Sequence, residues 1–307
     1  MNILLKCLPT IVFAVAGLIL TGCHSGPRIP VETPTSGNIY ISVDESFKPV
    51  IDSQLKVFES SFPNAKIHVS YKPEATCLRD LNNDSVRMVI VTRGLTLSEE
   101  RYFRDSTKTP AFSGILAFDA VALVVNNHSR DTVMSMDDVR ALLAGQDKLK
   151  REAVMDGVSA TSTVRYVLDS VLRGVALGKN VIAARSSPQV ISYVSEHENA
   201  VGFIGVSWIG DQEDSMELAF LKKVKVVAIR CDRCTDKPFV YPLAANIVLK
   251  KYPMVRGLYY ILKENYSGVG NNFVNFLQYE RGQLIFKRAY LVPARMNFDV
   301  RDVEIQQ

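Results

Sequence analysis

Hydroxyl side chains are concentrated in residues 156–165 (DGVSATSTVR), where a strand-like run gives way to a helix-like one: Ser159, Thr161, Ser162 and Thr163. The first turn of a helix leaves backbone N–H groups without partners, and these groups attract anions together with the positive end of the helix dipole. Arg165 can add a fork of donors to two oxygens of an oxyanion. The segment therefore predicts a site for a small oxyanion. The alternative is a helix cap whose hydroxyl residues only favour a helix start.

Two further segments place similar donors after strand-like runs. In residues 44–47 (DESF), Ser46 can donate its hydroxyl, and the backbone N–H groups of Ser46 and Phe47 can point toward the same ligand. Arg93 follows the third strand-like run, where a strand delivers side chains to the edge of a sheet. The alternatives are an N-cap at Ser46 and a solvated surface arginine at position 93.

Strand-like and helix-like segments alternate along the chain and would position these residues. Strands are predicted at residues 38–43, 65–71, 87–92, 118–125, 150–155, 200–204, 224–229 and 240–249. Helices are predicted at residues 46–62, 74–81, 97–103, 136–143, 161–172 and 190–194, and the tail from 253 to 288 is expected to be mostly helical. This alternation predicts an α/β fold with a mainly parallel sheet and helices on both of its faces.

The length of the chain allows two lobes, each with its own core. The tail is long enough to return to the first lobe, so we expect lobe 1 to consist of residues 38–120 with 238–307, and lobe 2 of residues 121–237. The crossings between them are expected near residues 118–125 and 224–240. Ligands of open α/β sheets bind beyond the carboxyl ends of strands, so two such lobes predict a cleft with donors from both sides.

The amino terminus has the pattern of an export signal. An apolar run at residues 11–20 is about the length of a signal-peptide core and too short to span a bilayer comfortably. Residues 20–23 (LTGC) are similar to a lipobox, which predicts cleavage after residue 22 and acylation of Cys23; an ordinary signal peptide is the alternative. We expect residues 1–22 to be the signal peptide and residues 23–37, rich in Pro, Ser, Thr and Gly, to be a lipidated tether.

The charge balance and the cysteines of the chain bear on its partners, its disulfides and its metal content. The 36 Lys and Arg residues against 32 Asp and Glu, without a basic run, argue against a nucleic-acid partner. Cys231 and Cys234 follow a strand-like run in a chain expected in an oxidising compartment, which favours a disulfide over a redox pair or half of a zinc site. The histidines show no metal-ligand spacing, and no cofactor or metal is expected.

Several segments in order resemble the phosphate-binding proteins of bacterial phosphate ABC transporters, the PstS-like family. The resemblance runs from about residue 38 to residue 294 and rests on residues 44–47 (DESF), 91–96 (VTRGLT), 118–126 (FDAVALVVN), 159–165 (SATSTVR), 200–205 (AVGFIG), 241–243 (YPL) and 282–285 (GQLI). It implies a two-lobed type II periplasmic binding protein fold with a ligand cleft between the lobes.

The resemblance also implies site residues. Ser46 and Phe47 match the first phosphate loop of the family, and Ser159, Ala160 and Thr161 match its Ser-Gly-Thr loop. The family's acidic residue after the third strand, which accepts the proton of hydrogen phosphate, is replaced here by Thr92-Arg93. Its arginine before the Ser-Gly-Thr loop is absent as well, and Arg93 and Arg165 are the candidates to supply that positive charge. The candidates for the missing proton acceptor are Asp119 and Asp156.

These expectations combine into one function. The chain is expected to be a binding protein, not an enzyme, that captures inorganic phosphate for the permease subunits of an ABC transporter. It is expected in the cell envelope, lipid-anchored to a membrane and facing the periplasm, or the outer side of a single-membrane bacterium. The alternatives are another tetrahedral oxyanion, such as sulfate or molybdate, and a phosphate sensor without a transport role. A hydrolase using Ser159 lacks a base at a suitable position.

Overall fold

The structure is a computed structural model, and it describes residues 32–105, 107, 110–157, 159–210, 213 and 215–296. The compact unit that begins at Thr33 contains the elements described below. The predicted signal peptide and Cys23 lie outside the described residues. No helix in the described ranges has the length and apolar character needed to cross a membrane.

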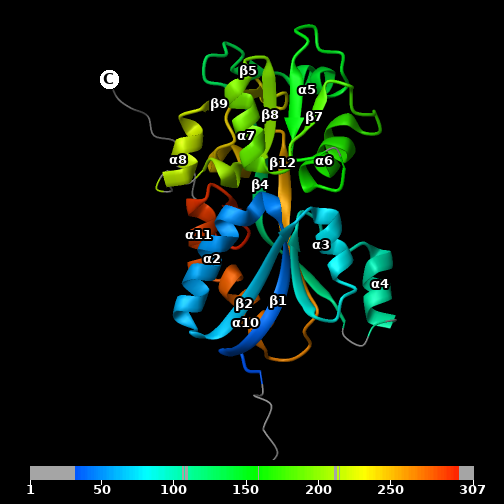
Figure 1. The fold of residues 1–307 in the computed structure, drawn as a ribbon, viewed down its shortest axis with the longest axis vertical. Coiled ribbons are helices and arrows are strands. Elements are labelled where there is room, and N and C mark those ends of the chain that lie inside the picture. The colour runs from blue at the N-terminus through cyan, green and yellow to red at the C-terminus, as the bar shows by residue number, and fades with distance from the viewer. Residues whose placement is uncertain are drawn as a thin grey trace, which may run out of the picture. The chain divides into compact units, whose positions relative to one another are not determined.

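One large mixed sheet runs through this unit (Figure 1). Within the described residues it has ten strands, of which eight follow the order β2-β1-β3-β12-β4-β8-β6-β7, while β13 and β9 also pair with β4. The bounds along this order are β2 Asn64–Lys72, β1 Ser36–Asp44, β3 Val86–Val91, β12 Val255–Leu262, β4 Phe112–Asn126, β8 Ala200–Gly205, β6 Glu152–Met155 and β7 Val181–Ala183, with β13 Val292–Pro293 and β9 Val224–Val226. A small second sheet has the order β11-β10-β5, with β11 Phe239–Val240, β10 Ala228–Arg230 and β5 Val133–Met134.

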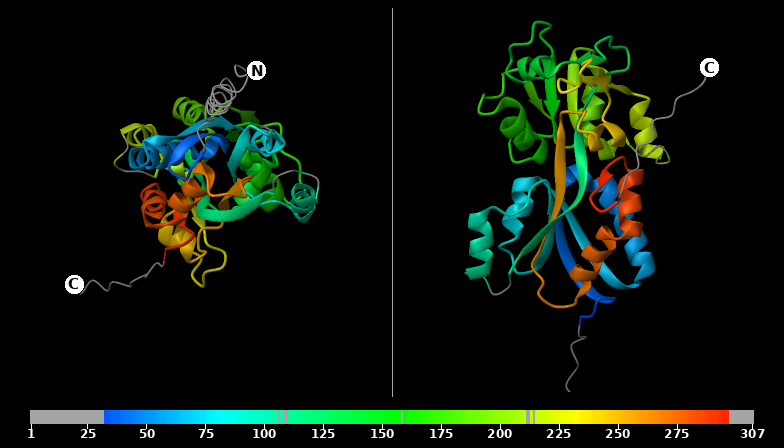
Figure 2. Two further views of the ribbon diagram at one scale, coloured as in Figure 1. Left: turned by 90° about the horizontal axis from the view of Figure 1, so that it is seen from below. Right: turned by 180° about the vertical axis from the view of Figure 1, so that it is seen from behind.

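The sheet joins two lobes. Lobe A is built on the parallel strands β2, β1 and β3, and lobe B on the parallel strands β8, β6 and β7. Between them β4 and β12 run antiparallel to each other and to β8 and β3, respectively. These two long strands pass from one lobe to the other (Figure 2). The expected mainly parallel sheet is therefore confirmed within each lobe, and the connecting ribbon is antiparallel.

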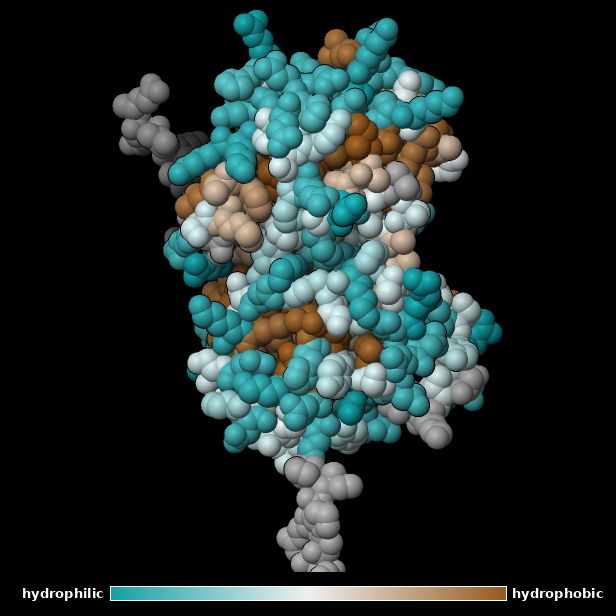
Figure 3. Space-filling model, in the orientation of Figure 1, coloured by the Kyte–Doolittle hydropathy of each residue, from teal (hydrophilic) through white to brown (hydrophobic). Residues whose placement is uncertain are grey.

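Helices cover both lobes. Those of lobe A are the 3₁₀ helix η1 Glu45–Phe47, α2 Lys48–Ser61, α3 Glu74–Asp80, α4 Leu97–Asp105, α10 Val269–Gln278 and α11 Glu280–Arg288. Those of lobe B are α5 Met136–Leu143, α6 Ser162–Tyr166, the π-helical η2 Val167–Leu172, α7 Ser187–Glu196, the 3₁₀ helix η3 Val206–Trp208, α8 Ser215–Leu221 and α9 Ala244–Val248. On the face seen in Figure 3, hydrophilic surface surrounds the junction of the lobes, and apolar surface shows on the lobes on either side.

The tail of the chain packs on lobe A through aromatic side chains. The helical spacing in α2 buries Ile51, Leu55 and Phe58 on one face. The Phe58 ring lies 5.0 Å from the ring of Phe273 and 5.5 Å from that of Phe276, both in α10 and in edge-to-face geometry. This contact attaches the last helices to the first lobe of the chain.

The sequence prediction was wrong in two places near the carboxyl end. Residues 240–249 are not a strand: Pro242 ends the short β11, and α9 begins two residues later. The first part of the predicted helical tail is a strand, because residues 255–262 form β12, in which Arg256 and Leu258 alternate with partly buried neighbours. Residues 224–229 were predicted as one strand and are divided at Val227 between β9, which pairs with β4, and β10, which pairs with β5.

The division of residues 224–229 into two strands also concerns the crossing between the lobes that was expected at residues 224–240. Residues 224–240 stay with lobe B, through β9 beside β4 and β10 beside β5. The strand that runs back along β4 into lobe A is β12. It pairs with β4 along its length, beginning with Val255 opposite Ala120, and its second half pairs with β3 as well. The lobe boundaries at residues 120 and 238 stay a prediction.

Candidate functional site

A buried arginine lies where the connecting ribbon meets both lobes. Arg256, in β12, is 5% exposed, and it is the cross-strand neighbour of Asp119 in β4. Its Nε donates to Asp119 Oδ2 at 2.8 Å. Its guanidinium carbon lies 5.2 Å from the centre of the buried Phe47 ring, a cation–π arrangement that helps to hold a charge out of water.

Hydroxyl groups from both lobes converge on this guanidinium. Arg256 Nη1 donates to Ser162 Oγ at 3.0 Å and to Thr163 Oγ1 at 3.4 Å, both in α6 of lobe B. Ser46 Oγ, from η1 of lobe A, lies 3.3 Å from Ser162 Oγ. Within the described part of the chain, Arg256 Nη2 has no hydrogen-bond partner although it is buried. An unsatisfied buried donor of this kind calls for an acceptor, which an oxyanion supplies.

Glycine leaves room beside the guanidinium, where a larger residue would make close contacts. A Cβ at Gly205, the last residue of β8, would lie 3.2 Å from Arg256 Nη2 and 3.4 Å from both Asp119 Oδ2 and the carbonyl oxygen of Ser46. The carbonyl oxygen of Ser46 also accepts from Ser207 Oγ at 2.9 Å. The segment 44–47 of lobe A is thus held directly against lobe B.

Three buried carboxylates surround Arg256. Burial raises the pKa of Asp44 to about 6, against the opposing effect of the Arg256 charge. Burial also raises the pKa of Asp119 and of Asp156 above their ordinary values, again opposed by Arg256. Burial thus opposes the ionisation of all three carboxyl groups, and the single guanidinium favours it, so the site combines hydrogen-bond acceptors with a positively charged donor.

The carboxylates differ in how far their oxygens are already used. Asp156 accepts from Thr161 Oγ1 at 2.9 Å and from Thr163 Oγ1 at 3.3 Å. Asp44 Oδ1 accepts from the backbone N–H of Ser46 at 2.9 Å, whereas Asp44 Oδ2 is buried without a hydrogen-bond partner in the described part of the chain. Asp119 Oδ1 is likewise buried without a partner among the described residues, so Asp44 and Asp119 each offer an acceptor, and Arg256 a donor, in the same group of residues.

Arg165, predicted to contact the ligand, forms an ion pair across the lobes. Its Nε donates to Glu74 Oε2 at 2.5 Å, and its Nη2 donates to Thr92 Oγ1 at 2.7 Å. Glu74, at the start of α3, is 2% exposed and also accepts from the backbone N–H and the hydroxyl of Thr92. Burial opposes ionisation of Glu74, but the donors of Arg165 and Thr92 outweigh it, and the pKa of Glu74 is lowered. This pair joins α6 of lobe B to the end of β3 in lobe A.

Arg93, also predicted to contact the ligand, forms its ion pair with Glu99 in lobe A. Its two terminal nitrogens each donate to one carboxylate oxygen of Glu99 at 2.8 Å, and Nη1 also donates to the carbonyl oxygen of Gly94. Glu99 lies in the first turn of α4, so this ion pair ties the loop after β3 to that helix. The side chain is engaged within lobe A.

The predicted loop of Ser159, Ala160 and Thr161 is split between surface and interior. Ser159 and Ala160 are exposed, and Thr161 is the buried N-cap of α6, its hydroxyl oxygen accepting from the N–H of Val164 at 3.3 Å. Ala160 has φ +69°, a conformation that suits the glycine found there in the resembling family. Its carbonyl oxygen accepts from the N–H of Ala75 at 3.0 Å, a backbone contact between the lobes.

Sequence reasoning missed Arg256 and Asp44 as site residues. A signal for Asp44 was present, because it stands directly before Ser46 at the end of a strand. Arg256 carried no such signal, since its segment was predicted as a helix and its pairing with Asp119 is set by the register of β12 against β4. The structure brings Ser46, Phe47, Asp119 and Asp156 together around Arg256, and their role in binding stays a prediction.

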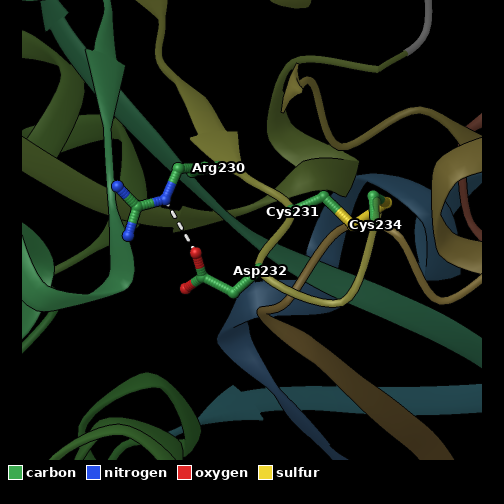
Figure 4. Close-up of a disulfide and its surroundings, with 4 residues drawn as sticks. All are labelled: Arg230, Cys231, Asp232 and Cys234. Atoms are coloured by element: carbon green, nitrogen blue, oxygen red, sulfur yellow. Dashed lines mark hydrogen bonds and ion pairs between the residues drawn. A yellow bond between two sulfur atoms is a disulfide. The ribbon is translucent and has the colours of Figure 1, made fainter. Parts of the chain in front are cut away.

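The cysteine pair lies away from this group. Cys231 and Cys234 form a disulfide at the end of β10, and Arg230 Nε donates to Asp232 Oδ1 at 2.7 Å within the same loop (Figure 4). Cys77 is a buried free thiol. In the described ranges no group of three or more His, Cys, Asp or Glu side chains is arranged to hold a metal ion.

Comparison with known proteins agrees with this architecture. A family model described as a PBP superfamily domain matches residues 30–281. A protein from Clostridium perfringens, described as a phosphate ABC transporter substrate-binding protein and solved with bound phosphate, superposes with a TM-score of 0.70 at 19% identity, covering 84% of this chain and 100% of that one. An ABC-type phosphate transport receptor from Vibrio cholerae gives a TM-score of 0.60 at 20% identity, covering 84% of this chain and 100% of the receptor.

No curated protein matches the sequence. At 19–20% identity the two solved structures establish a shared fold, which is the two-lobed type II periplasmic binding protein fold expected from the sequence. The family match covers most of the chain by itself. The chain belongs to the PBP superfamily.

Proposed function

We propose that the protein is an exported, lipid-anchored binding protein that captures inorganic phosphate between its lobes and delivers it to the permease subunits of an ABC transporter. The observation that carries the proposal is the buried guanidinium of Arg256, which keeps one donor unpaired beside hydroxyls from both lobes. A buried donor without a partner costs free energy unless a ligand satisfies it. A tetrahedral oxyanion fits this need with several acceptor oxygens at once.

The fold supports a phosphate ligand. Among solved structures of similar fold, the Clostridium perfringens protein holds bound phosphate, and the Vibrio cholerae protein is a phosphate transport receptor. Both are fully covered by the superposition with this chain. The same fold gives no reason to assign catalysis, so binding without reaction is the function that we propose.

Asp44 is the residue that we propose as the acceptor of the phosphate proton. Its Oδ2 is buried without a partner among the residues that the structure describes, and burial raises its pKa to about 6. Hydrogen phosphate can donate its proton to this oxygen, whereas sulfate carries no proton and would face an uncompensated negative charge. Asp156 and Asp119 stay candidates. Asp156 already accepts from Thr161 and Thr163. Asp119 Oδ2 accepts from Arg256, whereas Asp119 Oδ1, like Asp44 Oδ2, is buried without a partner in the described part of the chain.

Calorimetric titration of the chain from residue 24 with phosphate, sulfate and molybdate tests the proposal. We expect binding of phosphate and a clear preference over sulfate. The variant Ser162→Ala removes a hydroxyl that faces both Arg256 and Ser46, and it should weaken phosphate binding by roughly tenfold, the effect of about one hydrogen bond to a charged group. Ser192→Ala on the exposed side of α7 is the matched control and should bind like the wild type.

The selectivity variant is Asp44→Asn. It keeps the shape of the side chain but replaces an acceptor with an amide that can donate to sulfate, so the ratio of phosphate to sulfate affinity should fall. A wild type that binds none of the three anions would overturn the proposed function. Unchanged discrimination in Asp44→Asn would instead remove Asp44 as the acceptor and leave the anion site in place.

Export and anchoring rest on the sequence alone, through the apolar run at residues 11–20 and the lipobox-like residues 20–23. A protein of this superfamily that serves a transporter must lie outside the cytoplasmic membrane, where a diacylated or triacylated Cys23 would hold it near the permease. The absence of acidic residues directly after Cys23 favours retention inside the envelope.

A further inference from the structure

A second cavity lies on the other face of the connecting ribbon. Successive residues of a strand point to opposite faces of a sheet. Asp119 and Arg256 face the anion site, whereas their neighbours Phe118 and Val255 line a cavity of about 690 Å³. This volume is within the range of sites that hold small organic ligands.

The floor of the cavity is apolar. Buried side chains from lobe B and from the end of the chain form it, among them Met136 of α5, Val171 of η2, Ile247 of α9 and Val292 of β13. Phe118, which is 39% exposed, adds an aromatic surface at the ribbon. A polar ion such as phosphate would lose its hydration here without compensation, so this floor calls for a hydrocarbon group.

The rim of the cavity is basic. Four cationic side chains on its wall form no ion pair within the described part of the chain: Arg173, Arg233, Lys250 and Lys251. The one acidic side chain on the wall, Asp232, already accepts from Arg230 at 2.7 Å. Asp232 and Arg233 lie in the loop that the Cys231–Cys234 disulfide closes, and Figure 4 shows Asp232 in this loop.

We propose that this cavity is a second binding site, which takes a single-chain amphipathic carboxylate of the fatty-acid class. The hydrocarbon chain lies on the apolar floor, and the carboxylate lies among the basic side chains of the rim, where arginine can bind it through two parallel hydrogen bonds. A diacyl lipid carries two chains and needs a larger cavity. The site is separate from the anion site, because the ribbon of β4 and β12 lies between them.

Calorimetry with decanoate tests the proposal on the chain from residue 24, which keeps every described element of the fold. Decyltrimethylammonium has the same chain with a cationic head, and acetate has the carboxylate without the chain. We expect saturable binding of decanoate, at least about tenfold weaker binding of decyltrimethylammonium and no measurable binding of acetate. Equal binding of decanoate and decyltrimethylammonium would show that the rim does not select charge, and this would overturn the proposal.

The double variant Arg233→Glu with Lys250→Glu reverses two exposed charges of the rim and leaves the apolar floor unchanged. It should weaken decanoate binding by at least about tenfold. The matched control is Lys56→Glu with Lys223→Glu, which makes the same change in net charge at exposed positions away from the cavity. Equal loss of binding in both double variants, or no loss in the first, would overturn the assignment.

Phosphate titration of the same variants separates this site from the proposed function. Both double variants should bind phosphate like the wild type, because the changed residues lie on the other side of the ribbon from Arg256. Decanoate binding in a protein that fails to bind phosphate would leave the second site standing. Binding of phosphate in competition with decanoate would show a single shared site and contradict the proposal.

Discussion

Replacing Glu45 with glutamine should make the stability of the protein less dependent on pH. Glu45 lies in η1 of lobe A, and its carboxylate accepts from the backbone N–H of Ser187 at 3.3 Å and from the Ser187 hydroxyl at 3.2 Å, at the start of α7 in lobe B. Burial, followed by repulsion from Asp156, raises the pKa of Glu45 from 4.5 to about 7. Glutamine keeps the shape and an acceptor oxygen but carries no charge.

Proton linkage fixes the direction of the effect. The folded pKa of Glu45 lies above the unfolded value, so the folded state binds more protons between these two pKa values. The stabilisation is complete below about pH 4.5 and is lost as the pH rises through about 7. Each pKa unit corresponds to about 1.4 kcal/mol, which sets an upper limit of about 3 kcal/mol for this group. Because Glu45 keeps some contact with water, solvent screening reduces the expected effect to about 1–2 kcal/mol.

Glu45→Gln should therefore unfold with a free energy about 1–2 kcal/mol higher than the wild type near pH 8, and with an equal free energy near pH 4. Urea unfolding followed by the fluorescence of Trp208, the one tryptophan of the sequence, measures both values. Glu100→Gln, at an exposed position of α4, is the control and should show no such trend. A difference between Glu45→Gln and wild type that does not change with pH, or a less stable variant near pH 8, would refute this reasoning.

Three further changes test other parts of the structure. Glu74→Gln leaves Arg165 without its charged partner across the lobes and should lower the free energy of unfolding by about 2–3 kcal/mol at neutral pH. The pKa of Glu74 is lowered, so the difference should shrink as acid protonates the wild type, and equal urea midpoints at neutral pH would contradict this prediction. Ala160→Gly relieves the positive φ of Ala160 and should raise the free energy of unfolding by about 0.5–1 kcal/mol after the entropic cost of glycine; a loss of similar size would show that the loop is not strained. Cys23→Ala should abolish metabolic labelling with a palmitate analogue, and equal labelling of variant and wild type would exclude acylation at this residue.

Most of lobe A and lobe B could be predicted because each element depends on local patterns. The apolar spacing of α2 fixes its buried face, and the predicted α5 at residues 136–143 agrees with the structure because Ser135 and Asp138 form a capping box at its start. The alternation of strands and helices then gives the parallel strands of each lobe. These signals lie within a few residues of the elements that they specify.

The partners of the predicted arginines could not be read in the same way. Arg165 and Arg93 were identified as free donors for an anion, but their partners Glu74 and Glu99 are chosen by how α6 packs against α3 and by how the loop after β3 turns toward α4. Glu74 is distant from Arg165 in the sequence, and no spacing rule links them.

The case of Arg256 shows how one wrong element can hide a site. The segment 255–262 contains apolar and aromatic residues that fit either a buried helix or a strand. As a helix it would have no fixed relation to residue 119. As a strand paired with β4 it must place residue 256 opposite Asp119, and the alternation of side chains must then put both charges on one face and Phe118 and Val255 on the other. The ribbon of β4 and β12 thus specifies two sites at once. A slip of one residue in the register of β12 would turn Arg256 toward the cavity face and separate it from Asp119.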